Sequence, residues 1–423
     1  MHAGQHRADV ATVRTEAELV TRTTPAKVLF VAYGSGHVKM VVPLALALAA
    51  SSRAEPLVLA LTTAEPFARA AGLEVIQFKD FVTSGDGAAL QRGECLMQGL
   101  GGPVADPQET VAYLGLSMAD LIDDVGAEKA ALAYRQFGRQ AFLPVRTLHR
   151  ILRQVAPDLV VCTNSPRAER AAVLAARQLG IPSICVVDLF AIDEVTWIGA
   201  PDYADVVCVL NDSVRQFLVA AGRSEKQVVV TGNPGFDALN APAALAQGRQ
   251  IREQRGWMDR HVILWPTQVE PNFHPFDGRP GDPTLPERAL AAVMRWVLSR
   301  TDCVLCIRPR AGEALPIVPA DPRIVFTGQD WPLAPLLHAT DLVVTLNSTV
   351  GLEGHLTGCR LIQVLGSVFD QAMPLAHYGI ADAAIPVDEI PRTLEHWVDA
   401  PRLAMHLQAP ATQQVLAVMG RFL

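Results

Sequence analysis

The chain has 423 residues, of which 50% are hydrophobic and 19% are charged, and its formal net charge is −7. This length and composition indicate two or three globular domains and exclude a disordered chain. The negative charge, without a basic tract, argues against nucleic acid as a main partner. No apolar run reaches the roughly 18 residues of a membrane span, so we expect no transmembrane segment.

Residues 1–25 lack the apolar core of a secretory signal, and we expect them to form a flexible extension of a cytoplasmic protein. The seven cysteines are an odd number and lie mostly within apolar runs, which is typical of reduced core thiols. Cys303 and Cys306 spell CxxC inside a strand-like run. No second cysteine or histidine pair follows at metal spacing, so we expect core packing and no metal site.

Strand-like and helix-like segments alternate along the first half, which is typical of a parallel α/β architecture. The predicted strands are 27–33, 57–61, 74–77, 159–162, 183–187, 206–209 and 228–230. The predicted helices are 38–50, 109–154 and 167–179. Residues 83–107 are rich in Gly, Ser, Asp and Pro, and we predict a long loop there.

The same alternation of strand-like and helix-like segments starts again near residue 240. We therefore predict an N-terminal domain over 26–240 and a C-terminal domain over 241–423. Strands are predicted at 262–265, 304–308, 324–326, 342–346 and 361–365, and helices at 242–255, 287–299, 333–339 and 349–357. Residues 266–286 form a second predicted loop. Ligands of such sheets bind at the carboxyl ends of the strands, so we expect two Rossmann-like domains facing each other across a cleft.

The stretch LVVTLNSTVGLE, residues 342–353, predicts a nucleotide site. Its apolar strand ends at Asn347, Ser348 and Thr349, which can cap the helix that follows. The free N–H groups and the dipole of that helix end favour an anion. Glu353 lies about one turn further in, where a carboxylate can accept hydrogen bonds from sugar hydroxyls. We therefore predict a diphosphate at the helix tip and a ribose on Glu353.

Other strand ends carry further candidates. Arg308 ends the strand 304–308 and can clamp a diphosphate in a bidentate way. Thr267, followed by Gln268, comes after the strand 262–265 and can also reach phosphate. Asn164 and Asp188 end two strands of the first half and are candidates for the acceptor side. A solvated or capping role is the alternative for each of them.

The first strand ends in the turn YGSGH. Gly34 and Gly36 allow a tight turn and close backbone approach to a ligand. Lys39 stands where the third glycine of a dinucleotide fingerprint would be, which disfavours NAD. His37 opens the next helix and is a candidate general base, since imidazole titrates near neutrality. The alternative is a capping or packed histidine.

Three motifs follow one another in a known order: GSGH, then TGNPGFDAL at 231–239, then NSTVGLEGHLTGCRLIQV at 347–364. In these motifs the chain, from about residue 27 to 390, resembles GT-B glycosyltransferases, above all capsule and lipopolysaccharide-type transferases. It is also similar to the peptidoglycan N-acetylglucosaminyl transferase and the UDP-N-acetylglucosamine 2-epimerases. The resemblance implies that His37 lies beside the acceptor and the anomeric carbon. It also implies that Gln371, or Asp370 beside it, contacts sugar or ribose.

The resemblance implies a glycosyltransferase that moves a sugar from a nucleotide-activated donor to an acceptor hydroxyl, without a metal or a cofactor. The acceptor stays open; a lipid-linked one would bring the protein to the inner membrane surface. Two alternatives remain, a UDP-sugar 2-epimerase or hydrolase and a non-catalytic nucleotide-sugar-binding scaffold. An epimerase needs several acids, and the sequence offers only Asp188, Glu270 and Asp370. The epimerases' Asp-Ser-Gly-Gly turn and HRREN-like stretch are absent.

Overall fold

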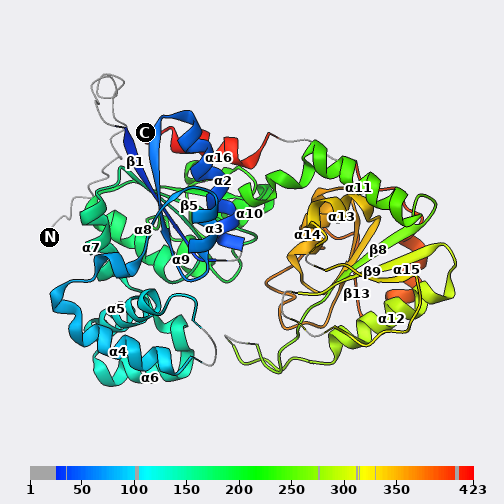
Figure 1. Ribbon diagram of the computed structural model, residues 1–423, viewed down its shortest axis with the longest axis horizontal. Helices are drawn as coiled ribbons and strands as arrows, with labels where there is room; N and C mark the ends of the chain where they lie inside the picture. The colour runs from blue at the N-terminus through cyan, green and yellow to red at the C-terminus, as the bar shows by residue number, and fades with distance from the viewer. Residues whose placement is uncertain are drawn as a thin grey trace, which may run out of the picture. The chain divides into compact units, whose positions relative to one another are not determined.

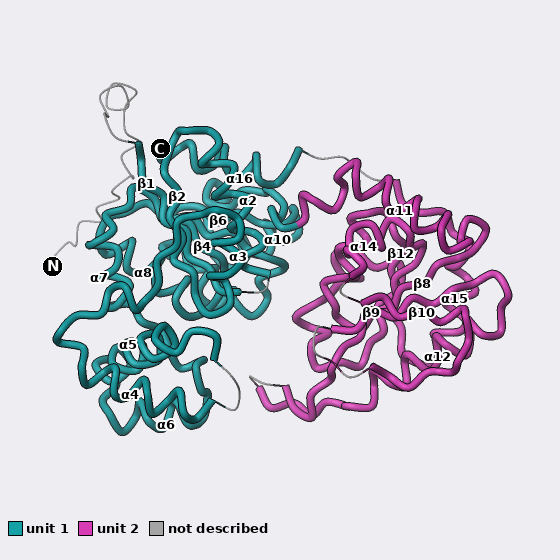
Figure 2. Tube along the Cα trace, in the orientation of Figure 1, with its two compact units in different colours: residues 1–235, 409–423 teal, residues 236–408 magenta. Residues whose placement is uncertain are grey.

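The computed structural model describes residues 25–423 apart from 35, 101–103, 275–276, 311–312, 314, 329 and 405–408. The predicted extension therefore lies outside the described residues, except for Pro25. The chain divides into two compact units (Figure 2). Unit 1 comprises the residues up to 235 together with 409–423, and unit 2 comprises 236–408. The predicted domain boundary at residue 240 falls at the end of the short 3-10 segment Pro234–Asn240.

Unit 1 is built on a seven-stranded sheet whose order is β3-β2-β1-β4-β5-β6-β7, and every neighbouring pair is parallel. Its strands are β1 Ala26–Ala32, β2 Ala54–Ala60, β3 Glu74–Ile76, β4 Leu159–Thr163, β5 Ser183–Val186, β6 Val206–Val209 and β7 Val228–Val230. Its helices are α2 Gly36–Ser51, α3 Ala64–Ala70, α4 Gly87–Gln98, α5 Pro107–Val125, α6 Ala127–Phe137, α7 Val145–Val155, α8 Ala168–Leu179, α9 Val195–Ile198, α10 Asp212–Ala220 and α16 Ala411–Met419. The central strands are buried along their whole length, as strands covered by helices on both faces must be.

The C-terminal helix α16 belongs to unit 1, so the prediction that residues 409–423 are part of the second domain is wrong. Val415, Val418 and Met419 are buried in the core that also contains Phe30 of β1 and Leu44 of α2. An apolar helix gains its stability from whichever sheet face it covers. The helical pattern by itself does not say which sheet that is.

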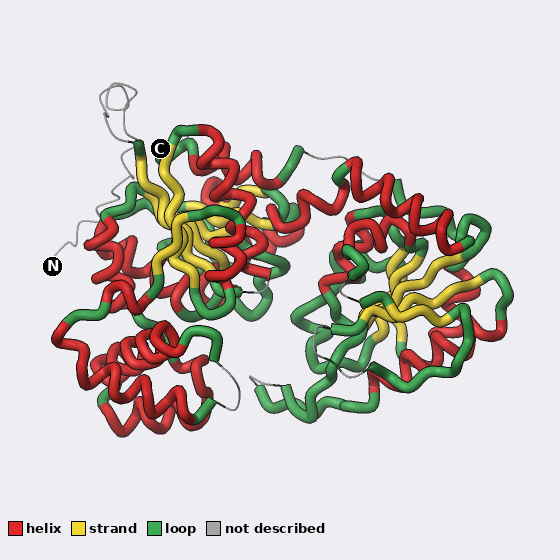
Figure 3. Tube along the Cα trace, viewed as in Figure 1, coloured by secondary structure: helices red, strands yellow, loops and turns green. Residues whose placement is uncertain are grey.

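The prediction of a long loop over 83–107 is also wrong, because this region contains α4. Figures 1 and 3 show α4, α5 and α6 as a helical group inserted between β3 and β4. Gly93 of α4 and Gly115 of α5 let the two helices approach closely. A Cβ atom at Gly93 would lie 2.1 Å from the carbonyl oxygen of Val111, and one at Gly115 would lie 2.3 Å from that of Ala89. These glycines serve helix packing rather than a loop.

Unit 2 contains a six-stranded parallel sheet of order β10-β9-β8-β11-β12-β13. The strands are β8 His261–Pro266, β9 Cys303–Arg308, β10 Ile324–Phe326, β11 Leu342–Thr345, β12 Arg360–Val364 and β13 Ala383–Ile385. The helices are α11 Pro242–Arg255, α12 Leu285–Ser299, α13 Leu333–Ala339, α14 Thr349–Leu356 and α15 Ile390–Trp397. Cys303 and Cys306 are buried in β9, as predicted for core residues.

In each sheet the first three strands lie side by side towards one edge, and the chain then crosses over to add the remaining strands on the other side of the first strand. The crossing places β1 beside β4 in unit 1 and β8 beside β11 in unit 2. Such switch points leave an open crevice at the carboxyl ends of the two central strands, where ligands of parallel sheets bind. The predicted polar residues His37 and Asn164 follow the two central strands of unit 1, and Thr267 and Ser348 follow those of unit 2. None of the described helices is long and apolar enough to cross a membrane.

Candidate functional site

The tip of α14 forms as the sequence predicts. Ser348 is the N-cap, and its Oγ accepts a hydrogen bond from the N–H of Val350 at 3.3 Å. The N–H of Ser348 donates to Thr345 Oγ1 at 3.1 Å, which anchors the turn to the end of β11. Thr349, the first residue of the helix, is exposed. The capping prediction is confirmed, and the helix tip presents two hydroxyls at the positive end of its dipole.

Arg308 and Glu353 accompany this tip. Arg308, half-buried at the end of β9, donates from Nη1 to the carbonyl oxygen of Trp331 at 2.9 Å. Burial lowers the pKa of Arg308, while the negative charges of Glu353 and Asp330 oppose that shift. The Arg308 guanidinium and the carboxylate of Glu353, about one turn into α14, are therefore electrostatic partners. This pair can serve a phosphate and a ribose hydroxyl respectively.

Asn347 and Thr267, both predicted to bind the donor, are engaged by the protein itself. The Oδ1 atom of Asn347 accepts from the Nε2 atom of Gln268, and its Nδ2 atom donates to Ser367 Oγ at 2.6 Å. The hydroxyl of Thr267 hydrogen-bonds the carboxylate of Glu313 and accepts from the N–H of Arg310 at 3.0 Å. Their positions at the switch point agree with the sequence, but their side chains organise neighbouring loops.

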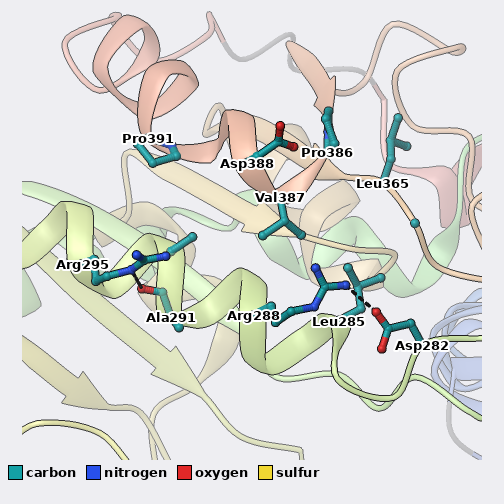
Figure 4. Close-up of a pocket in the computed structure, with 12 residues that line it drawn as sticks. Asp282, Leu285, Arg288, Ala291, Arg295, Leu365, Pro386, Val387, Asp388 and Pro391 are labelled. Carbon is teal, nitrogen blue, oxygen red and sulfur yellow. Dashed lines mark hydrogen bonds and ion pairs between the residues drawn. The ribbon is translucent and has the colours of Figure 1, made fainter.

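The loop after β12 carries Asp370 and Gln371. The Oδ2 atom of Asp370 accepts from the N–H of Gly366 at 2.7 Å, and burial raises the pKa of this carboxyl. Gln371 is exposed in the turn that follows. Beside this loop lies a hollow of about 690 Å³ between α12 and the residues after β13. In it Arg288 is paired with Asp282 (Figure 4), so this cation is already neutralised.

At the switch point of unit 1, Gly34 is required by packing, because a Cβ atom there would lie 1.8 Å from Thr63 Oγ1. Gly36 meets no atom within 4 Å, so packing does not require it. His37 lies half-buried on the first turn of α2. Its Nδ1 atom is buried and has no hydrogen-bond partner among the described residues.

Glu169, in the first turn of α8, is fully buried although a charged residue at a helix start is more often solvated. Its Oε1 atom accepts from the N–H of Tyr33 at 2.8 Å. Its Oε2 atom finds no hydrogen-bond partner in the described part of the chain. Burial raises the pKa of Glu169, and the charge of His37 is the largest influence that lowers it. The imidazole and this carboxyl are therefore electrostatic partners.

Asn164 joins two carboxyl groups, Asp188 and Glu194. Its Nδ2 atom donates to Asp188 Oδ1 at 2.9 Å and to Glu194 Oε1 at 3.2 Å. Its Oδ1 atom accepts from the N–H of Asp188 at 3.0 Å. From the GNP motif, Asn233 donates to the carbonyl oxygen of Asp188 at 2.8 Å. Two acids are thus held together at the ends of β4 and β5.

Burial, and then the nearby charge of Asp188, raise the pKa of Glu194 from 4.5 to about 7. A carboxyl with such a pKa exchanges its proton near neutrality, as a general acid or base must. Sequence reasoning selected Asn164 and Asp188 but missed Glu194. The residue lies in an irregular segment six positions beyond Asp188 (188 to 194), where no periodicity indicates that it turns back towards the strand ends.

Two parallel α/β units of this kind, each with its polar residues at the switch point of its sheet, have the GT-B fold. No protein-family model matches the chain, and no curated protein matches it. A Staphylococcus aureus MnaA–UDP structure is similar with a TM-score of 0.58 at 12% identity, over 94% of this chain and 96% of that one. UDP-GlcNAc 2-epimerase from Neisseria meningitidis, bound to UDP-GlcNAc, gives 0.57 at 11% identity over 93% and 100%. The glycotransferase of kitacinnamycin gives 0.51 at 14% over 94% and 95%.

These similarities establish the fold that the sequence motifs predicted. At such identities they establish the fold alone. The GT-B fold is shared by the 2-epimerases and the glycosyltransferases among these structures. A choice between the two activities must therefore come from the residues of this chain.

Proposed function

We propose that this protein is an enzyme that acts on a nucleotide sugar and holds the nucleotide diphosphate in unit 2. The observation that carries this proposal is the tip of α14, where Ser348 and Thr349 lie at the switch point of the sheet with Arg308 and Glu353 beside them. The helix dipole, two hydroxyls and a guanidinium favour the diphosphate, and Glu353 can accept from the ribose. With these groups, the diphosphate can be bound without a metal ion.

For the reaction we propose 2-epimerisation or hydrolysis of a UDP-sugar rather than transfer to an acceptor. Epimerisation must remove the proton from C2 and return one to the opposite face. Loss of the C2 proton can accompany cleavage of the C1–O bond, whose electron pair leaves with UDP, and the reverse addition restores the nucleotide sugar. The Asp188–Glu194 pair supports this chemistry, because Glu194 can accept or give a proton near pH 7.

Similarity to solved structures supports the same choice. The Neisseria enzyme and a Methanocaldococcus jannaschii enzyme, with a TM-score of 0.58 at 11% identity, are both UDP-GlcNAc 2-epimerases. Glu169 and Glu194 also add two acids to those that the sequence indicated. The objection that this chain lacks enough acids for an epimerase is therefore weaker than the sequence suggested.

Transfer of the sugar remains the second candidate, because one specific observation favours it. His37 has a buried carboxyl partner in Glu169, and such a pair can deprotonate an acceptor hydroxyl. The third possibility, a scaffold without turnover, would bind the nucleotide sugar at the same tip of α14 and leave it unchanged.

The experiment is incubation of the purified protein with UDP-GlcNAc in D₂O, followed by NMR. We expect deuterium at C2 of the sugar, together with the 2-epimer or free UDP. Release of UDP without deuterium at C2, and only after an acceptor is added, would favour transfer. Binding of UDP in calorimetry without any reaction would favour the scaffold. If UDP does not bind at all, the nucleotide-sugar proposal is wrong.

A further inference from the structure

A chain of four side chains links three strand ends of unit 2. Gln268, after β8, donates from Nε2 to Asn347 Oδ1, after β11. Asn347 donates from Nδ2 to Ser367 Oγ, after β12, at 2.6 Å. Ser367 Oγ donates to Glu270 Oε2 at 2.7 Å. The chain thus starts and ends in the loop that follows β8 and passes through the two neighbouring strand ends.

The direction of every hydrogen bond in this chain is fixed by backbone groups. Gln268 Oε1 accepts from the N–H of Leu346 at 2.8 Å and from that of Asn347 at 3.3 Å. The amide of Gln268 must therefore point its Nε2 towards Asn347, and Asn347 must point its Nδ2 towards Ser367. Ser367 Oγ also accepts from the N–H of Phe369 at 3.1 Å. Both of its lone pairs are then used, and its single hydrogen goes to Glu270.

Glu270 is the end of the chain and also a direct anchor of the next loop. It is only 4% exposed. Its Oε1 atom accepts from the N–H of Val368 at 2.7 Å. With Phe369 held by Ser367 and Gly366 held by Asp370, the backbone N–H groups of 366, 368 and 369 all have side-chain acceptors. The Oδ1 atom of Asp370 has no hydrogen-bond partner among the described residues. The side chains from Gln268 to Glu270 are hydrogen-bonded to one another and to the backbone, and such a network holds its members in one arrangement.

A ring contact supports the same connection. The imidazole of His274 lies against the ring of Phe369, with 5.5 Å between their centroids. Arg279 also donates to the carbonyl oxygen of Val368 at 3.4 Å. The loop after β8 therefore holds the loop 366–371 through Glu270 and, further along the sequence, through His274 and Arg279. The held segment is the one that presents Asp370 and Gln371.

We propose that Glu270 is a positioning residue of the substrate site, which fixes the loop 366–371 and thereby places Asp370 and Gln371 for the sugar. The identity of the ligand rests on the proposed function. Glu270 acts through Ser367 and Val368. The tip of α14 keeps its own supports, because Thr345 holds Ser348 and Gln268 holds the N–H groups before it. Loss of Glu270 should therefore affect the sugar more than the nucleotide.

The test uses two ways of breaking the chain at its last link. Glu270→Gln keeps the size but places a donor where the hydrogen of Ser367 already points. Ser367→Ala removes the hydroxyl, and Ser367→Thr keeps it. Glu389→Gln, at an exposed position of the same unit, is the control. Hydrogen exchange of the free full-length proteins reports on the loop, and calorimetry with UDP and kinetics with UDP-GlcNAc report on the site.

In Glu270→Gln and Ser367→Ala we expect at least tenfold faster exchange over residues 366–370 and a five- to tenfold higher KM for UDP-GlcNAc. The Kd for UDP and the kcat should change less than twofold. Ser367→Thr and Glu389→Gln should resemble the parent protein. If Glu270→Gln does not fold, the comparison of Ser367→Ala with Ser367→Thr tests the proposal instead.

Unchanged exchange over 366–370 in both disrupting variants would overturn the proposal. An equal loss of affinity for UDP and UDP-GlcNAc would overturn it as well, since the effect would then not concern the sugar. If the parent protein binds neither compound, the proposed function fails. The exchange measurement would still decide whether Glu270 holds the loop.

Discussion

The switch points of the two units differ in how their polar groups are satisfied. In unit 2, the side chains of Gln268, Asn347 and Ser367 are bonded to one another and to the backbone. In unit 1, His37 Nδ1 and Glu169 Oε2 are buried without a hydrogen-bond partner among the described residues. Satisfied networks are rigid, whereas burial raises the pKa of Glu169. Under the proposed function, we expect nucleotide binding to depend on unit 2 and proton transfer to depend on the acids of unit 1.

The largest effect should follow from removal of the acid in unit 1. Glu194→Gln keeps the size of the side chain but cannot take or give a proton. General acid–base groups contribute about 10²- to 10⁴-fold, so we expect kcat with UDP-GlcNAc to fall by about that factor. Calorimetry should show the same affinity for UDP as in the parent protein.

Glu225→Gln is the control, because Glu225 is an exposed acid of the same unit. It should keep kcat within about twofold. A Glu194→Gln variant that retains full activity would remove the difference between the two units. Loss of UDP affinity in the same variant would mean that unit 1 also contributes to nucleotide binding.

A smaller effect should follow from the ribose contact in unit 2. Glu353→Ala removes a charged hydrogen-bond acceptor, which is worth about 1.5–3 kcal/mol, so we expect UDP to bind roughly ten- to a hundredfold more weakly. At saturating UDP-GlcNAc the kcat should change little. Glu389→Ala, an exposed acid of the same unit, should bind UDP normally. If Glu353→Ala lowers kcat and leaves UDP affinity unchanged, the division of roles is wrong.

The sequence predicted most of the strands, many of the helices and the capped tip of α14, because these follow from local patterns. Alternating apolar segments define the two sheets, and Ser348 caps α14 by a bond to its own backbone neighbour. The burial of Glu169 and the hydrogen bonds by which Asn164 joins Glu194 to Asp188 depend on tertiary structure. Local sequence patterns do not predict such contacts. The same holds for α16, whose apolar face fits a core that lies far away in the sequence.

The two units should also differ in how stability depends on pH. In unit 1, burial raises the pKa values of both Glu109 and Glu194 from 4.5 to about 7. The folded state then binds these protons more tightly than the unfolded state does. Their contribution is fully present below about pH 4.5 and is lost as the pH rises through about 7.

The smallest effect is therefore a change in thermal stability between pH 5 and pH 8. At about 1.4 kcal/mol per pKa unit, ionisation of Glu194 costs up to about 3 kcal/mol, with Asp188 and Asp193 as the neighbouring negative charges. In calorimetric melts, Glu194→Gln should gain stability relative to the parent protein at pH 8 but not at pH 5. An equal difference at both pH values would mean that Glu194 does not titrate in this window. The proton chemistry would then have to be assigned to His37 and Glu169.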